Sequence, residues 1–235
     1  MLPRGHSIRN RLLTVIDSSD LQRLLPSLEE VPLALGQVLE VPGKPISHVY
    51  FIQSGLVSVL AISGRNRCIE FGMIGPEGMT GFAAILDDDR SANQIVVQGA
   101  GTALRMSTAE LKCAMLSSIT LRSCLLRFVH VFMAQAGQTA LANGCAKLEE
   151  RLARWILMSH DRFGGSDVGV THDVLALCLG VRRPGITLAM HLLEGEGVIK
   201  STRSRISVVD RDGLHKHANT SYGVPETAYD RLFSR

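Results

Sequence analysis

Hydrophobic residues between positions 31 and 106 fall in short runs separated by turns that contain glycine. The runs at residues 38–41, 48–52, 56–60 and 95–97 have the length of β-strands. Their regular spacing indicates an antiparallel barrel or roll, although a β-sandwich produces a similar pattern. A short helix over residues 20–28 is expected to precede this sheet because its leucines recur at helical spacing.

Between residues 118 and 143 the hydrophobic positions follow a helical period and form two stripes. One stripe contains Leu121, Leu125, Phe128 and Phe132, and the other contains Leu126, Val129, Met133, Ala136 and Ala140. A helix with two apolar faces must be covered on two sides. We expect one face to pack on the sheet and the other on a second copy of the chain, in a parallel helix pair. Burial of both faces within one chain is the alternative.

The strongest local pattern lies between Thr171 and Glu194. Thr171 can cap a first helix, and Ala176 is small where two helices would cross. Gly180 can take the left-handed conformation of a tight turn, and Pro184 fits the first turn of a second helix. The expected buried side of that second helix consists of Ile186, Ala189, Leu192 and Leu193. Two short strands follow, so the segment predicts a winged helix-turn-helix.

The remaining positions of this motif supply candidate DNA contacts. On the second helix, the outer side and leading end carry Arg182, Arg183, Thr187 and His191, where a recognition helix reaches base edges and phosphates. In the hairpin, Lys200, Arg203 and Arg205 are expected to contact phosphates. From Arg182 to Arg205 there are five basic residues and two acidic ones. A solvated charged face is the alternative.

Composition narrows the class of protein. The net charge of the 235 residues is +3, which permits a polyanionic partner without requiring one. We find no phosphate loop, nucleophile elbow, metal-protease helix or catalytic triad, so the sequence predicts no enzyme. The five cysteines are far apart, and the N-terminus has no apolar core of the signal-peptide type. Residues 121–142 contain polar groups that a bilayer would penalise. We therefore expect a cytoplasmic protein with no membrane partner.

Several of these pieces, in this order, resemble the Crp/Fnr family of bacterial transcription regulators. The resemblance extends from about Leu21 to Leu214. It rests on Pro42-Gly43, Tyr50-Phe51-Ile52 with Gly55, the run at residues 75–81, Arg90-Ser91-Ala92, and residues 175–194 with the hairpin. It implies an α+β fold with an N-terminal antiparallel β-roll of the cyclic-nucleotide-binding type, a long dimerisation helix and a C-terminal winged helix-turn-helix. The implied division is a sensor over 1–116, a dimerisation helix over 117–143, a DNA-binding domain over 144–218 and a C-terminal tail over 219–235.

The resemblance implies a DNA-binding transcription regulator that acts as a homodimer on a palindromic operator, with RNA polymerase as a further partner. The family commonly reads a guanine with an Arg, matched here by Arg183, while the neighbouring Glu position holds Pro184. A further Arg of the cAMP-responsive members corresponds to Leu188. We expect Arg183 to make the main base contact. The alternative function is a sensor or interaction module of the same fold that does not bind DNA.

The expected effector site is incomplete for cAMP. Relatives that bind cAMP hold the phosphate with an Arg-Ser pair, matched by Arg90-Ser91, and the ribose with a Gly-Glu pair that falls at Gly78 to Gly81, where no carboxylate stands. A Thr-Ser pair near the adenine falls around Ala136-Gly137. The candidate effector residues are Gly78, Thr80, Gly81, Arg90, Ser91, Gln138 and Thr139. This disfavours cAMP and leaves open another effector, constitutive DNA binding, and an ion pair of Arg90 with residues 87–89.

No cofactor is assigned. No cysteine precedes Cys68, which argues against the iron–sulfur cluster of the oxygen-sensing relatives. Cys68, His48 and His6 have the right chemistry for haem ligands, but single residues of these types are usually structural, so haem is disfavoured. No metal site is predicted. Cysteines in apolar helical contexts are expected to be buried and inert, namely Cys113, Cys124, Cys145 and Cys178. A hinge between the two halves is expected at Asn143-Gly144.

Overall fold

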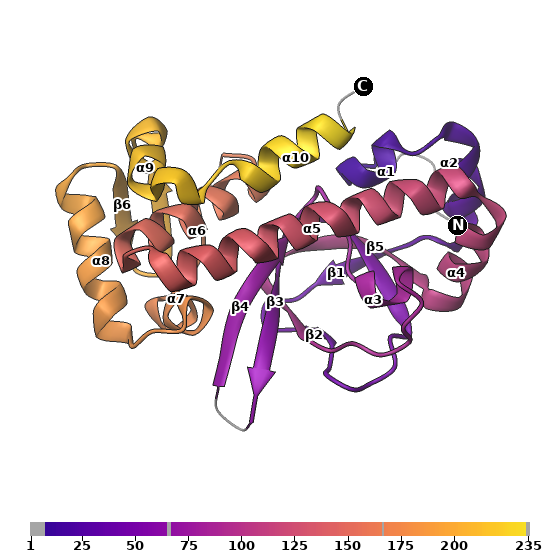
Figure 1. Cartoon of the computed structure of the whole chain (residues 1–235), viewed down its shortest axis with the longest axis horizontal. Coiled ribbons are helices and arrows are strands. Elements are labelled where there is room, and N and C mark those ends of the chain that lie inside the picture. Colours follow the sequence, from indigo (N-terminus) through magenta and orange to yellow (C-terminus); the bar gives the residue numbers. More distant parts are fainter. Residues whose placement is uncertain (1–7, 65–66, 166, 234–235) are drawn as a thin grey trace.

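The computed structural model describes residues 8–64, 67–165 and 167–233 of the chain. Its first half is built on one antiparallel sheet with the strand order β1-β5-β3-β4, in which β2 also pairs with β5. The strands are β1 Glu29–Leu33, β2 Val38–Glu40, β3 His48–Ser63, β4 Arg67–Ile74 and β5 Gln94–Ser107. Strands β1 and β2 pair with different parts of β5, while β3 follows β5 along most of its length (Figure 1). The antiparallel sheet expected from the hydrophobic runs is confirmed.

Strand β3 is a single strand that covers both of the strands predicted over residues 48–52 and 56–60. Its pairing with β5 is irregular between Ile52 and Leu56, and Gly55 has a φ of +89°. A Cβ atom at Gly55 would lie 2.4 Å from the carbonyl oxygen of Gly99, so a side chain does not fit there. A bulge bends a strand without ending it. The prediction of two strands over residues 48–52 and 56–60 is therefore wrong, because the chain continues through a bulge.

Helix α5, Ile119–Cys145, crosses the molecule from the sheet to the C-terminal half (Figure 1). Its first predicted stripe is buried in the same core as the sheet, with exposures of 5% or less at Leu121, Leu125, Phe128 and Phe132. The second stripe is mostly uncovered: Leu126 is 39% and Met133 65% exposed, whereas Val129 is buried. Around the sheet lie the short helices α1 Arg11–Val15, α2 Ser18–Leu24, α3 Phe82–Ile85 and α4 Thr108–Ser117. One predicted face of α5 therefore packs on the sheet, and the other lacks a cover within the described chain.

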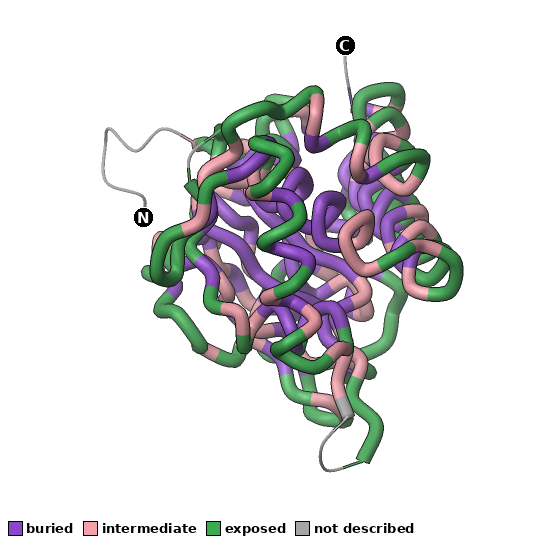
Figure 2. The backbone as a smooth tube through the Cα atoms, turned by 90° about the vertical axis from the view of Figure 1, so that its left-hand side faces the viewer, coloured by how far each residue is buried: buried purple, intermediate pink, exposed green. Residues whose placement is uncertain are grey.

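The C-terminal half has its own hydrophobic core. Its elements are α6 Leu148–Arg162, α7 His172–Leu179, α8 Arg183–Gly195, the hairpin β6 Ile199–Thr202 and β7 Arg205–Val208, and α9 Arg211–Ala218. Val168 pairs with Ile206 and extends the hairpin by one short bridge. Leu56 and Met73 of the sheet belong to this second core, so the two halves are in contact. Figure 2 shows buried backbone gathered in the interior, with exposed turns around it.

The segment expected to be a C-terminal tail is a docked helix. Helix α10, Val224–Phe233, turns back from the C-terminal half and lies along α5 near α1 (Figure 1). Tyr229 and Phe233 are buried in the core of the N-terminal half. Arg11 places its guanidinium 4.8 Å from the centre of the Tyr229 ring and 3.7 Å from the carboxylate of Asp230. The described part of the segment expected to be a tail over residues 219–235 is therefore packed on the core through the apolar face of α10.

The junction between α5 and α6 lies later than expected. Helix α5 continues through Asn143 and Gly144, and the backbone leaves the helical conformation at Ala146 and Lys147. The predicted helix break at Asn143-Gly144 is wrong by two to three residues. Within the described residues no single helix is long and apolar enough to cross a membrane, although the bent pair α4 and α5 meets the criteria of length and composition.

Candidate DNA interface and sensor site

The α7–α8 turn is formed as the sequence predicts. The Thr171 hydroxyl accepts a hydrogen bond from the Val174 amide at 3.3 Å and caps α7. Gly180 ends α7 with a φ of +63°, in the left-handed conformation that a tight turn requires. A Cβ at Gly180 would lie 2.9 Å from the Ile69 side chain, so glycine also permits close packing of the motif on β4.

Helix α8 buries one side and exposes the other. The buried residues are Ile186, Ala189, Met190 and Leu193. The prediction that Leu192 is buried is wrong, because this residue is 47% exposed. Met190, which lies at the helical spacing of the buried residues, is buried instead. Arg182, Arg183 and His191 are exposed and Thr187 is half-buried, so the four predicted contact residues of α8 reach the surface.

The interactions of these side chains are weak. Arg183 Nε lies 3.6 Å from Asp173 Oδ1, and both side chains are about two-thirds exposed. The Thr187 hydroxyl donates to the Arg183 carbonyl at 3.3 Å, and His191 lies 3.5 Å from Glu194. Exposed ion pairs contribute little to stability, so the guanidinium of Arg183 can exchange this partner for another at small cost.

The hairpin is fixed to α8 and carries the predicted basic residues outward. Glu194 accepts hydrogen bonds from the amide and hydroxyl of Ser201, at 2.7 and 2.6 Å, and these bonds hold the pKa of Glu194 below its usual value. Lys200, Arg203 and Arg205 are exposed. Arg205 pairs with Asp167 at 3.2 Å. The residues predicted to contact phosphates therefore lie on the wing. The ionised Glu194 carboxylate holds this wing against α8.

In the sheet half, a residue that the sequence analysis missed, Glu40, lies beside several of the predicted effector residues. The buried carboxylate of Glu40 on β2 accepts a hydrogen bond from the Gly81 amide at 2.8 Å. Burial raises the pKa of Glu40, and hydrogen bonds from Ser91, Gly81 and Thr80 oppose that rise. Three predicted effector residues, Gly81, Thr80 and Ser91, therefore lie around a carboxyl group of their own chain.

Arg90 and Gly78 also have contacts within the chain. Arg90 points outward, with Nη1 donating to the Gly43 carbonyl at 2.9 Å and Nε 3.8 Å from Asp89. This geometry matches the ion-pair alternative. A Cβ at Gly78 would lie 2.3 Å from the Phe128 ring, so Gly78 is required for packing against α5.

Of the two predicted contacts on α5, Thr139 has a hydrogen-bond partner within the chain. Thr139 is buried and its hydroxyl donates to the Gln135 carbonyl at 2.9 Å, while Gln138 is half-exposed. Gln135, which the sequence analysis did not select, pairs with both backbone groups of Met73: its Oε1 accepts from the amide at 2.6 Å and its Nε2 donates to the carbonyl at 3.2 Å. The sequence did carry a sign of this role, because Gln135 is a polar residue that continues the apolar stripe of Leu125, Phe128 and Phe132.

A buried carboxyl lies where the two halves meet. Glu70 on β4 accepts hydrogen bonds from Ser58 on β3 and from the indole of Trp155 on α6. Burial raises the pKa of Glu70, and these two donors oppose the rise. Burial also raises the pKa of the neighbouring Cys178 thiol on α7. Sheet, α6 and the first helix of the DNA-binding motif therefore share one polar cluster.

The expectation that four cysteines are buried holds for some of them and fails for others. Cys178 is buried and Cys124 half-buried, and burial raises the pKa of Cys124 to about 11; Cys113 and Cys145 are exposed, so the expectation of burial is wrong for those two. His48 lies at the start of β3 and Cys68 at the start of β4, whereas His6 falls outside the described residues. Among the described residues no group of three His, Cys, Asp or Glu side chains is arranged for a metal ion.

The structure combines an antiparallel sheet domain, a long helix and a winged helix-turn-helix. Two family models match the chain, the cyclic nucleotide-binding domain over residues 30–118 and the Crp-like helix-turn-helix domain over residues 150–217. The chain belongs to the Crp/Fnr family of transcription regulators. The residues that match these models end before α10 begins.

Similar proteins agree with this assignment. The transcriptional regulator SdrP of Thermus thermophilus is 24% identical over 200 residues, which cover 82% of this chain and 95% of SdrP. The structure of FixK2 from Bradyrhizobium japonicum has a TM-score of 0.71 at 16% identity, covering 80% of this chain and 96% of FixK2. A CRP-family transcriptional regulator from Thermus thermophilus has a TM-score of 0.68 at 17% identity, covering 83% of this chain and 99% of the regulator. The similar solved structures establish the fold.

Proposed function

We propose that the chain binds a palindromic DNA operator as a homodimer, with helix α8 of each copy in a major groove. The observation that carries the proposal is the exposed outer side of α8 beside a basic wing. Arg182 and Arg183 stand at the leading end of α8, and Lys200 and Arg203 stand on the wing. This arrangement suits base reading by the helix and phosphate contacts by the hairpin.

Within this proposal Arg183 makes the main base contact. Its guanidinium is about two-thirds exposed, and a guanidinium can donate two parallel hydrogen bonds to the O6 and N7 atoms of guanine. Arg182, Thr187 and His191 are proposed as flanking contacts. Leu188 is 64% exposed on the same helix and can contact a thymine methyl group. Pro184 accepts no hydrogen bond through its side chain, so the operator differs from one read by an Arg-Glu pair.

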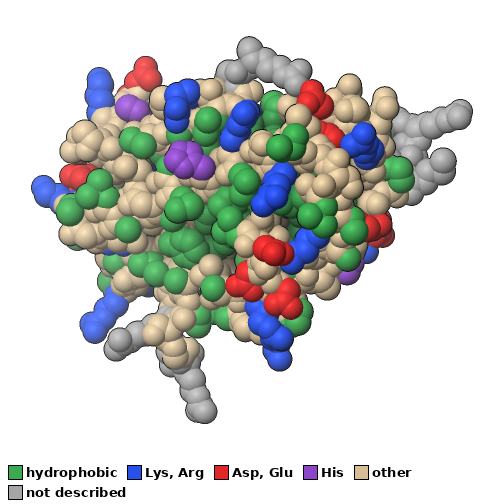
Figure 3. Space-filling view, turned by 45° about the vertical axis from the view of Figure 1, so that its right-hand side comes forward, with side chains coloured by type: hydrophobic (Ala, Val, Ile, Leu, Met, Phe, Trp, Pro, Cys, Tyr) green, Lys and Arg blue, Asp and Glu red, His purple; other side chains and the backbone are tan. Residues whose placement is uncertain are grey.

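The uncovered face of α5 supports the homodimer. Ile119, Leu126, Met133 and Ala140 follow one another at intervals of seven residues, and all four are exposed. A seven-residue apolar repeat is the pattern by which two helices pack along a seam. Figure 3, which turns the view of Figure 1 by 45°, shows hydrophobic side chains gathered near the centre of a face with charged groups around them. We propose that a second copy covers this seam.

The remaining parts of the proposal concern regulation. Residues 1–116 act as the sensor, 117–143 as most of the dimerisation helix and 144–218 as the DNA-binding domain. RNA polymerase is the proposed further partner. An effector changes the orientation of the two α8 helices through α5 and so changes operator affinity. Because Glu40 already satisfies the Gly81 amide, a cyclic nucleotide phosphate is a poor candidate for this effector.

Selection of binding sites from random duplex DNA tests the function. The purified protein is used with no ligand and, in parallel, with cAMP. We expect a palindromic site to be enriched in the absence of cAMP. Enrichment only with cAMP would contradict the reading of the sensor, and no enrichment in either arm would favour a sensor module that no longer binds DNA. An Arg182→Ala, Arg183→Ala variant serves as the control, since it should lose the enriched site while keeping its fold.

A further inference from the structure

The chain segment that leads into α10 is fixed to the C-terminal half. The carbonyl of Ser221 accepts a hydrogen bond from Nε of Arg154 on α6 at 2.8 Å, and Arg154 is buried. The hydroxyl of Tyr222 donates to the carboxylate of Asp161, also on α6. Burial raises the pKa of Tyr222, so this hydroxyl stays protonated and keeps its role as donor. Helix α10 therefore starts from a fixed point on the DNA-binding half.

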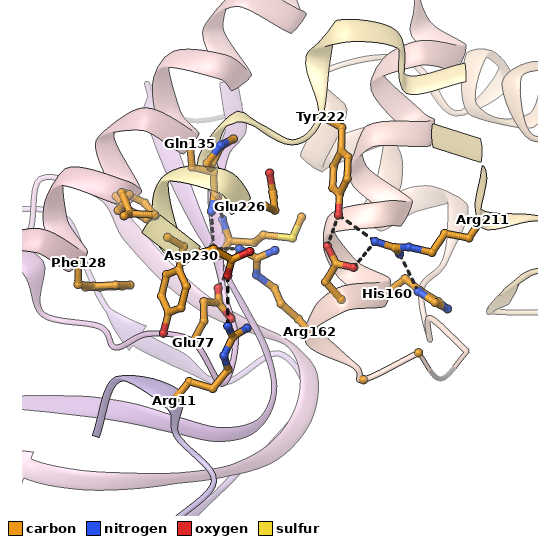
Figure 4. Close-up of a pocket in the computed structure, with 18 residues that line it drawn as sticks. Arg11, Glu77, Phe128, Gln135, His160, Arg162, Arg211, Tyr222, Glu226 and Asp230 are labelled. Atoms are coloured by element: carbon orange, nitrogen blue, oxygen red, sulfur yellow. Dashed lines mark hydrogen bonds and ion pairs between the residues drawn. The ribbon is translucent and has the colours of Figure 1, made fainter. Parts of the chain in front are cut away.

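Helix α10 itself is docked on the N-terminal half through one apolar face. Pro225, Tyr229 and Phe233 follow at intervals of four residues and are buried. The two aromatic rings belong to the core of the sheet domain. Figure 4 shows Arg11 beside Asp230 at this end, while Tyr222 and Arg211 lie together at the other. The helix thus has one end attached to each half of the protein.

The connection between the two attachments is short. Between Tyr222 and Pro225 the chain has only Gly223 and Val224. The Gly223 amide donates to Oε2 of Glu226 at 3.1 Å, which fixes the start of the helix. An extended residue spans at most about 3.6 Å, so these positions provide little slack. A rotation of the DNA-binding half would therefore pull on the docked helix.

Such a rotation would occur at the junction of α5 and α6. The backbone leaves the helical conformation there, at Ala146 and Lys147, and a few residues at the end of an element can act as a hinge. The halves also meet at β4, after which Glu77 pairs with Arg162 of α6 at 2.8 Å. A cavity of about 560 Å³ lies beside α10 and is lined by residues of α5, α6, α9 and α10. Because side chains leave this space unfilled, α10 bridges the halves there.

The docked helix leaves the DNA-reading surface open. Helix α8 lies at the end of the molecule away from α1 and α2 (Figure 1), and its outer side is exposed while α10 is docked. The arrangement that α10 holds is therefore compatible with DNA binding, and α10 does not cover the reading face.

We propose that α10 is a strap that fixes the orientation of the DNA-binding half on the N-terminal half, and that this restraint sets the positions of the two α8 helices in the homodimer. The second step rests on the proposed function. The two half-sites of a palindrome lie about 34–36 Å apart, and both α8 helices must reach them together. The restraint itself does not depend on DNA and is tested without it.

The test variant carries a flexible glycine–serine linker of about eight residues between Gly223 and Val224, which adds roughly 16 Å of average reach. Both attachments keep their contacts, so its thermal unfolding should match wild type. The matched control carries the same linker after Arg235, where it does not lengthen the strap. The readout without DNA is trypsin cleavage after Lys147, which is exposed at the junction, relative to cleavage after Arg203, which is exposed in the wing.

The relative cleavage rate at Lys147 should rise about five-fold or more in the test variant, because local opening exposes the junction to the protease. It should stay at the wild-type value in the control. Equal rates in the two linker variants overturn the strap.

On DNA, the test variant should bind the selected palindrome about ten-fold more weakly than the control and bind a single half-site equally well, since only the palindrome requires two α8 helices at a fixed spacing. Equal losses on both duplexes overturn the second step, because they would show damage to the reading surface itself. A gain on the palindrome overturns it too. If cleavage at Lys147 rises as expected and wild type binds no DNA, the proposed function fails while the strap stands.

A substitution pair tests the docked end separately. Phe233→Ser weakens the docking of α10 and should also raise cleavage at Lys147. Val224→Ser changes a 48% exposed position of the same helix and should leave cleavage unchanged. Thermal unfolding of both variants shows whether they fold, and the linker variant answers the question if Phe233→Ser does not. Equal cleavage in two folded substitution variants overturns the role of docking.

Discussion

The indole nitrogen of Trp155 lies 2.7 Å from Oε1 of Glu70, and this hydrogen bond joins the DNA-binding half to the sensor sheet. Glu70 is 5% exposed and Trp155 is 4% exposed. Ser58 donates to the other oxygen of the same carboxyl group. Ionisation of a buried carboxyl group is unfavourable, so ionisation of Glu70 destabilises the contact between the two halves.

This relationship predicts a dependence of stability on pH. The folded-state pKa of Glu70 lies above its value in the unfolded chain because of burial. The folded protein therefore binds this proton more tightly than the unfolded chain does. The stability that Glu70 contributes is fully present below the unfolded pKa and is lost as pH rises from there through the folded pKa. Glu70→Gln cannot ionise, so its free energy of unfolding should exceed that of wild type by a margin that grows over this interval.

Denaturant unfolding at a series of pH values measures the margin, and Trp155, the one tryptophan in the sequence, reports it by fluorescence. The matched control is Glu149→Gln, a half-exposed carboxyl on the same helix as Trp155, and it should keep the wild-type profile. A constant difference between wild type and Glu70→Gln across the pH series would contradict the assignment.

Arg183→Ala should cost about 1–3 kcal/mol of operator binding and relax the preference at one base pair. The reason is that two parallel hydrogen bonds to guanine are lost at that position only. Competition among operator variants with single base changes measures it. If the base preference were unchanged at every operator position, Arg183 would not contact bases.

Arg203→Ala should weaken binding to all sequences by a similar factor. Arg203 is exposed in the turn of the wing, between β6 and β7. Loss of one phosphate contact should reduce the slope of log K against log salt concentration by roughly 0.9. Titrations at several salt concentrations with operator and with unrelated DNA test this. A loss confined to the operator would mean that the wing reads bases.

Met133→Asp should convert the proposed dimer to a monomer. Met133 is 65% exposed in the middle of the proposed seam, and a pair of buried carboxylates would oppose packing there. Leu116→Asp is the control, because Leu116 is 84% exposed on α4, outside the seam. Sedimentation velocity of both variants distinguishes the outcomes: a dimer that survives Met133→Asp, or one lost in both variants, would place the interface elsewhere.

Local patterns predicted the DNA-binding motif well because its signals are short-range. Thr171 caps α7, Gly180 takes the left-handed conformation and Pro184 lies in the first turn of α8, each within a few residues of the group it affects. The stripe through Leu125 and Phe128 is equally local, since helical spacing alone defines it. Exposure of the outer side of α8 follows from the same periodicity.

The sensor was harder to predict because its groups meet across long sequence separations. Glu40 and Gly81 are 41 residues apart, and Gln135 and Met73 are 62 residues apart. No periodicity links such pairs. Helix α10 was missed for a different reason: it lies against α5, and its Tyr229 ring meets Arg11 of α1, more than 200 residues earlier in the chain. Its place could be found only from the fold.

Glu40→Ala should lower the free energy of unfolding by about 1–3 kcal/mol, because the Gly81 amide would be left buried without an acceptor. Glu40→Gln keeps an acceptor oxygen in a side chain of the same shape, so it should lose less than the alanine variant. Chemical unfolding of the two variants beside wild type gives the comparison, and isothermal titration with cAMP follows on each protein that folds. The same loss in both variants would show that the hydrogen bond to Gly81 is not the source of the effect. Strong cAMP binding by wild type would show that this carboxylate yields its place to a phosphate, and the sensor would then have to be reassigned as a cyclic nucleotide site.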